Sequence, residues 1–294
     1  MMVGVDEGRS GPEGGAVGVR VVTDSACDLS QDLVDALGIE VVPLTIRFGA
    51  DEFVDRDELS ADAFWDRLRA SDALPETSAP SAGSFEACYR DLIARGATGI
   101  LCINLSSRLS ATMQAAQVAA ASIGGECPVQ VIDSRTVSMG LGALCLTAAR
   151  RAADGDPLDR IVDEVIGRRD RTRLFGALDT LEYLKKGGRV GNARALLGTM
   201  LSIKPVVEIR DGVVEEAGKV RTRSKSLKVL VDKVAARPID TLSVLHGQAD
   251  DLEELLDLLS PIKPRDEIVT GIVGPVIGTH AGPGVIGVSF QLHP

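Results

Sequence analysis

Short, apolar runs rich in β-branched residues alternate with amphipathic segments through the first half of the sequence. The run 99–105 is continuously apolar, which is typical of a strand covered on both faces. Ser30 and Ser60 are placed to cap the helices that follow them. This alternation predicts an α/β domain with a doubly wound, mostly parallel sheet. The expected strands are 19–24, 41–48, 99–105 and 129–133, and the expected helices are one after Ser30, 60–69, 84–95, one from about 110, 139–153 and 157–169.

The pattern changes after residue 173. Two apolar runs, 203–210 and 213–220, flank Asp211-Gly212, a dipeptide favoured in the tight turn of a β-hairpin. A hairpin mixed with helices indicates an α+β domain that contains antiparallel strands. The other expected elements are strands at 174–178, 240–246, 267–273 and 285–291 and helices at 180–186, 224–236 and 250–259.

These patterns divide the chain into three parts. Residues 1–18 are glycine-rich and lack periodicity, so we expect a disordered leader. Residues 19–165 are expected to form the N-terminal α/β domain, and residues 166–294 the C-terminal α+β domain.

The composition limits the classes of function. The chain has 32 basic and 42 acidic residues, a net charge of -10, which argues against nucleic-acid binding and against binding to anionic membranes. Aromatic residues make up only 3%, so any pocket should have aliphatic walls. The five cysteines show no paired spacing, which indicates neither a disulfide framework nor a metal site. No apolar run approaches 18 residues and no signal-like segment opens the chain, so we expect a cytoplasmic protein without stable membrane insertion.

Two hydroxyl-rich segments are candidates for binding an anion. Thr77 and Ser78 lie between Pro75 and Pro80, which restrict the backbone and leave the hydroxyls free to donate to an oxyanion. The alternative is a proline-rich turn whose hydroxyls satisfy its own backbone. Ser106, Ser107 and Ser110 follow the strand 99–105, at the edge where open α/β sheets bind ligands and where a helix N-terminus attracts anions. Plain helix capping is the alternative for these serines.

His280 and two arginines are the other candidates. His280 lies among Gly278, Gly282 and Gly284, and it can hydrogen-bond a carboxylate or phosphate or act as an acid or base. Nothing in the sequence supplies a catalytic dyad partner for it. Arg189 and Arg221 follow turns and suit an anion or an acidic partner, although each is also an ordinary surface charge. No nucleotide-binding loop, nucleophile elbow or zinc-protease motif is present, so we expect no cofactor and no metal.

The chain carries a set of short motifs: Asp24-Ser25, Val42-Pro43-Leu44, Thr77-Ser78-Ala79-Pro80-Ser81, Ser106-Ser107-Arg108-Leu109-Ser110-Ala111-Thr112, Asp133-Ser134, the run from Asp179 to Arg189, Lys204-Pro205, Lys219-Val220-Arg221-Thr222 and His280-Ala281-Gly282-Pro283-Gly284. Taken together, these motifs resemble the DegV family over about residues 19 to 291. Two positions depart from the family pattern: Ala79 stands where glutamine is usual, and Ala111 where glycine is common. Both substitutions leave the neighbouring hydroxyl side chains in place, so they affect only the fine geometry of anion binding.

The resemblance implies a lipid-binding protein with one long-chain fatty acid, such as palmitate or oleate, buried between its two domains. It implies that Thr77 and Ser110 hold the carboxylate, with Ser107 and His280 close by. The protein would present this carboxylate to a separate ATP-dependent kinase subunit, with Arg189 and Arg221 on the partner or phosphate side. The acyl phosphate would feed lipid metabolism, and the protein itself would not be an enzyme.

Two other functions stay open from the residues alone. One is a stand-alone phosphotransfer or hydrolytic enzyme that uses His280 as phosphoacceptor or base. The other is a docking module in which the basic residues of its surface matter more than any pocket.

Overall fold

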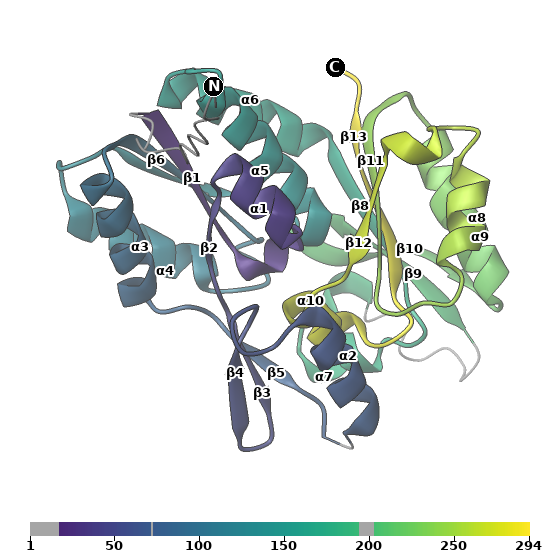
Figure 1. Ribbon diagram of the computed structural model, residues 1–294. Coiled ribbons are helices and arrows are strands. Elements are labelled where there is room, and N and C mark those ends of the chain that lie inside the picture. Colours follow the sequence, from purple (N-terminus) through teal and green to yellow (C-terminus); the bar gives the residue numbers. More distant parts are fainter. Residues whose placement is uncertain (1–17, 72, 194–202) are drawn as a thin grey trace, which may run out of the picture.

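The computed structural model describes residues 18–71, 73–193 and 203–294 (Figure 1). The disordered leader expected at 1–18 therefore lies outside the described residues, apart from Gly18, which begins the first strand. The strands are β1 Gly18–Asp24, β2 Glu40–Val42, β3 Thr45–Phe48, β4 Asp51–Val54, β5 Glu76–Ser78, β6 Ala97–Asn104, β7 Val129–Asp133, β8 Thr172–Ala177, β9 Lys204–Arg210, β10 Val213–Val220, β11 Ile239–His246, β12 Ile268–Ile272 and β13 Ile286–Leu292. The helices are α1 Gln31–Leu37, α2 Ala61–Ala70, α3 Ala82–Ala94, α4 Thr112–Ile123, α5 Ser138–Ala153, α6 Leu158–Arg171, α7 Glu182–Lys186, α8 Arg223–Ala235, α9 Leu252–Leu259 and α10 Pro275–Ala281, with short 3₁₀ turns η1 at Ser25–Cys27 and η3 at Arg265–Glu267.

The N-terminal domain is built on a parallel sheet in the order β2-β1-β6-β7. Helices α3 and α4 cover one face, while α1, α5 and α6 cover the other (Figure 1). Because both faces are covered, β6 is buried along most of its length, as its unbroken apolar sequence predicts. The predicted doubly wound α/β fold is confirmed.

The strand predicted at 41–48 is wrong, because the structure divides it. β2 ends at Val42 and belongs to the parallel sheet, whereas β3 begins at Thr45 and belongs to a small antiparallel sheet in the order β4-β3-β5. Pro43 separates the two strands; it has no N–H to continue the ladder. Strands β4 and β5 were not predicted, and β5 contains Thr77, which the sequence placed in a loop.

The C-terminal domain has a mixed sheet in the order β10-β9-β8-β13-β11-β12. Asp211 and Gly212 both have positive φ and form the predicted hairpin turn between β9 and β10. Helices α8 and α9 cover one face of this sheet, and the other face is turned toward the N-terminal domain (Figure 1). The predicted separate α+β domain is confirmed.

The two domains are joined by polar contacts and a shared apolar core. Ser106 donates a hydrogen bond to the Gly212 carbonyl at 2.7 Å, and Arg108 donates to the Asp211 carbonyl at 3.1 Å. The hairpin turn of one domain is thereby held by the loop after β6 of the other. The boundary predicted at 165/166 falls inside α6, which contacts both β6 and β13, so this division of the chain stays a prediction.

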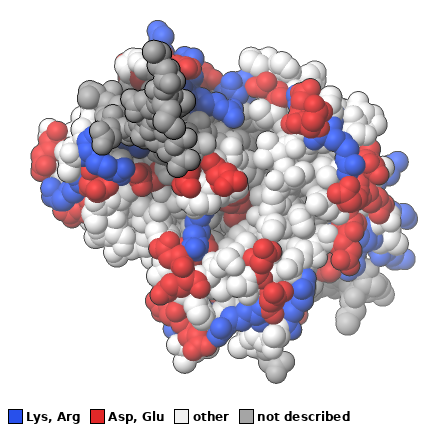
Figure 2. All heavy atoms as spheres, in the orientation of Figure 1, with Lys and Arg blue, Asp and Glu red and all other residues white. Residues whose placement is uncertain are grey.

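The surface is consistent with the mixed charge of the chain. Figure 2 shows acidic and basic side chains interspersed on one face of the molecule, around a broad uncharged area. Among the described helices, none has both the length and the apolar character needed to cross a bilayer.

Candidate functional site

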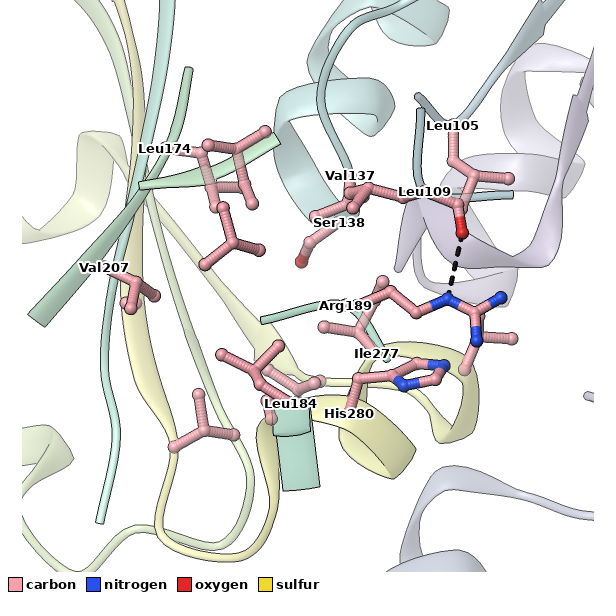
Figure 3. Close-up of a pocket in the computed structure, with 18 of the residues that line it drawn as sticks. Leu105, Leu109, Val137, Ser138, Leu174, Leu184, Arg189, Val207, Ile277 and His280 are labelled. Carbon is pink, nitrogen blue, oxygen red and sulfur yellow. Dashed lines mark hydrogen bonds between the residues drawn. The ribbon is translucent and has the colours of Figure 1, made fainter. Parts of the chain in front are cut away.

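A cavity of about 270 Å³ lies between the two domains (Figure 3). Its walls are mostly aliphatic, as the low aromatic content predicts. The C-terminal sheet contributes residues such as Leu174 and Val207, and the loops after β6 and β7 contribute Leu105, Leu109 and Val137. A mostly aliphatic cavity of this kind suits an alkyl chain.

One end of the cavity is polar. His280 of α10 lies against Thr77 of β5, with 2.9 Å between His280 Nε2 and Thr77 Oγ1. Ser110 lines the same cavity from the loop before α4, and its hydroxyl lies 2.8 Å from that of Thr112. Arg189 also lines it and donates through Nε to the Leu109 carbonyl at 3.1 Å. Thr77, Ser110, His280 and Arg189, named from the sequence as candidates, therefore line one cavity.

The imidazole of His280 is neutral at physiological pH. Burial, together with the nearby positive charge of Arg189, lowers the pKa of His280 to about 4. Its Nδ1 is buried without a hydrogen-bond partner among the described residues. Two hydroxyls and a neutral imidazole beside a guanidinium can bind an anion, but no described carboxylate orients this ring as in a catalytic dyad.

The glycines around His280 serve helix packing. A Cβ on Gly187 would lie 2.3 Å from His280 Nδ1, and a Cβ on Gly278 would lie 2.5 Å from the Phe64 ring. These glycines let α7 and α2 approach α10 closely.

The structure places Ser107 and Arg221 outside the cavity. The Ser107 hydroxyl donates to the Asp133 carboxylate, and the Ser107 backbone N–H donates to the same group at 3.2 Å. Ser107 is exposed and does not line the cavity. Arg221 is exposed in the connection between β10 and α8 and does not line it either.

Two buried aspartates that position the site were not identified from the sequence as functional. Asp24 accepts hydrogen bonds from the Asn104 side chain and from the backbone N–H of Leu105, which fixes the end of β6, and burial raises its pKa to about 6. Asp28 accepts from Ser138 Oγ at 2.6 Å and from the Gly274 backbone N–H at 3.1 Å. Burial raises the pKa of Asp28 to about 7. For Asp24, the sequence signal was the Asp24-Ser25 pair at the end of the first strand.

A family model described as "Uncharacterised protein, DegV family" matches residues 18–293. The chain belongs to the DegV family. A DegV domain-containing protein of Streptomyces coelicolor is 36% identical over 276 residues, which cover 92% of this chain and 97% of that protein. A DegV domain-containing protein of Clostridium acetobutylicum is 32% identical over 276 residues, with the same coverage of both chains.

Solved DegV structures share this fold. A DegV family protein from Thermus thermophilus, described for its fatty acid binding, is 32% identical with a TM-score of 0.86 and covers 94% of this chain and 100% of its own. DegV from Bacillus subtilis, described as a fatty acid binding protein, is 27% identical with a TM-score of 0.84 and covers 95% of this chain and 100% of its own. These two DegV proteins bind fatty acids.

Proposed function

We propose that this protein binds one long-chain fatty acid in the cavity between its domains, with the carboxylate at Thr77, Ser110 and His280. The observation that carries the proposal is the arrangement of side chains in the cavity, which is aliphatic along most of its walls and has two hydroxyls and an imidazole at one end. The fatty-acid binding described for the related DegV proteins of Thermus thermophilus and Bacillus subtilis supports the same ligand class.

The apolar slot supplies most of the affinity. Burying about fifteen methylenes at about 0.8 kcal/mol each contributes on the order of 10 kcal/mol before the costs of binding. The polar end then determines which way round the acid lies. Because an unpaired carboxylate is expensive to bury, the acid should bind with its carboxylate at the end of the cavity that carries the hydroxyls.

We further propose that the bound carboxylate is presented to a separate ATP-dependent kinase subunit in the cytoplasm. Neutral hydrogen-bond donors leave a carboxylate nucleophilic, whereas a bidentate arginine clamp would withdraw its charge. Arg189 already donates to the carbonyls of Leu109 and Gly187. In this proposal Arg189 and Arg221 act on the phosphate or partner side, and the acyl phosphate enters lipid metabolism.

A binding measurement with two matched variants tests the first proposal. Palmitate and oleate are titrated into delipidated wild type, into Thr77→Ala/Ser110→Ala and into Ser107→Ala. The double variant should bind at least about tenfold more weakly, because each lost hydrogen bond to a charged group removes about 1.5–3 kcal/mol. Ser107→Ala should bind like wild type, since Ser107 lies outside the cavity. Equal affinity of all three proteins would refute the head-group assignment.

A kinase assay tests the second proposal. The protein is incubated with ATP and oleate alone, and then with a bacterial ATP-dependent fatty acid kinase subunit added. We expect acyl phosphate only in the second reaction. Its formation in the first reaction would show instead that this chain is an enzyme in its own right.

A further inference from the structure

Two hydroxyls interrupt the aliphatic part of the cavity, away from its carboxylate-binding end. Thr77, Ser110, Arg189 and His280 form the polar end, and the other hydroxyl side chains that line the cavity are Ser138 and Ser289. Figure 3 shows Ser138 between the sheet residues Leu174 and Val207 and the pair Arg189 and His280. An alkyl chain alone gives such hydroxyls nothing to bond.

Ser289 lines the cavity from strand β13. The chain leaves His280 at the end of α10 and enters β13 at Ile286, so β13 runs away from the head-group end. Ser289 is three residues into this strand, roughly 10 Å along it. Gly287, which also lines the cavity, precedes Ser289 on the same face, and Leu174 of β8 pairs with Ser289 and lines the cavity beside it.

Ser289 is a mostly buried residue that lines the cavity. The residue is 4% exposed, and its hydroxyl is not one of the fully enclosed polar atoms that lack a partner among the described residues. An alkyl chain that covers this hydroxyl removes its hydrogen bonds to water without replacing them, which is unfavourable. A ligand oxygen in the cavity would restore one of them.

Ser138 adds an acceptor on the opposite wall. Its hydroxyl donates to Asp28 at 2.6 Å, so only its oxygen lone pairs remain for a ligand. Its backbone has φ of +52°, a left-handed conformation that is uncommon for serine. The side chain is held at the cavity wall by this bond to Asp28, which also accepts from Gly274.

We propose that the acyl slot recognises a long-chain fatty acid that carries a hydroxyl group along its chain, with Ser289 as the residue that distinguishes it from the plain acid. This inference rests on the proposed fatty-acid binding and names the substrate class of the same cavity. The ligand hydroxyl satisfies Ser289, whereas a plain alkyl chain leaves it unpaired. Ser138 offers a second acceptor on the facing wall.

Competitive binding of stearate, 10-hydroxystearate and 12-hydroxystearate tests the inference. Wild type should bind at least one hydroxystearate about five- to tenfold more tightly than stearate, the factor expected when a hydroxyl that the plain acid would leave unpaired gains a partner. Ser289→Ala should abolish this preference while binding stearate at least as tightly as wild type. Ser243→Ala is the matched control, because Ser243 pairs with Ser289 on β11, is equally buried and does not line the cavity.

The outcomes separate the two proposals. Wild type that binds stearate and both hydroxystearates equally contradicts the hydroxyl preference and leaves fatty-acid binding intact. A preference that persists in Ser289→Ala contradicts the role of Ser289. Wild type that binds none of the three acids contradicts the proposed function itself. If Ser289→Ala does not fold, the wild-type competition alone decides, and equal binding of stearate and both hydroxystearates overturns the inference.

Discussion

The protonation of His280 couples the site to pH in a defined direction. Burial, assisted by Arg189, lowers the pKa of His280 to about 4 in the folded protein, whereas a histidine in the unfolded chain titrates near 6.5. Between these two values the unfolded chain binds a proton that the folded protein does not. The free energy of unfolding therefore falls as the pH falls from 6.5 toward 4.

The variant His280→Gln should remove this dependence. We expect wild type to lose on the order of 1–2 kcal/mol more stability than the variant between pH 7 and pH 5, because each unit of pKa shift is about 1.4 kcal/mol. Urea denaturation of both proteins at the two pH values measures the difference. Parallel pH profiles would show that His280 titrates normally.

Three serines after β6 illustrate what the sequence reveals at this scale. The sequence places Ser106, Ser107 and Ser110 at the ligand edge of the sheet, and Ser110 does line the cavity. Ser106 instead bonds Gly212, and Ser107 bonds Asp133. Because these partners lie far away in the chain, local sequence cannot distinguish the three hydroxyls.

Asp28 links three elements whose positions determine the cavity. It follows η1, accepts from Ser138 at the start of α5, and accepts from Gly274 at the start of α10, which carries His280. Burial raises its pKa to about 7, above the ordinary value of 3.8. The folded protein holds this proton more tightly than the unfolded chain, so stability from Asp28 is lost as the pH rises through 7.

The variant Asp28→Asn should lose this pH response. Between pH 8 and pH 6.5 wild type should gain on the order of 1 kcal/mol of stability that the variant does not gain. His280 is present in both proteins, so its own titration cancels in this comparison. Chemical denaturation at the two pH values provides the measurement, and an equal gain in both proteins would contradict the account of Asp28.

The close approach of α7 and α10 makes Gly187 a sensitive position. A Cβ there would lie 2.3 Å from His280 Nδ1, so Gly187→Ala should displace the ring from Thr77 and weaken fatty-acid binding about tenfold. Gly167→Ala is the control, since nothing lies within 4 Å of its Cβ position on α6. The control should bind normally and gain about 0.5–1 kcal/mol of stability. Normal binding by Gly187→Ala would contradict the positioning of His280.

Elements with strong periodicity were predictable, and short strands were not. The alternation of strands and helices and the Asp211-Gly212 hairpin follow from local patterns. The division of 41–48 at Pro43 and the strand β5 do not, because β3 and β5 pair although β4, α2 and a loop separate them in the chain. Thr77 was therefore named as a ligand candidate while its strand was missed.

At the scale of the whole molecule, the hairpin turn holds the domains together. Ser106→Ala leaves the Gly212 carbonyl without its side-chain donor, and we expect a loss of about 1–3 kcal/mol in the free energy of unfolding. Ser107→Ala, at the next and exposed position, should change stability by less than about 0.5 kcal/mol. Urea denaturation compares the two, and equal stabilities would show that the hairpin contact does not join the domains.

The two-domain architecture was predictable, but the surface between the domains was not. The change of pattern after residue 173 indicates a second domain of another class. The cavity depends on residues from β5, β8, β9, α10 and the loops after β6 and β7, and no local pattern relates them. Only the resemblance to the DegV family connected Thr77, Ser110 and His280 before the structure placed them together.

Native mass spectrometry of the purified protein tests the central claim most directly. We expect the wild-type chain to carry one mass increment equal to a single long-chain fatty acid, either from the cells or after palmitate or oleate is added. The increment should be strongly reduced in Thr77→Ala/Ser110→Ala and retained in Ser107→Ala. A wild-type protein that stays unliganded after both acids have been added would contradict the account.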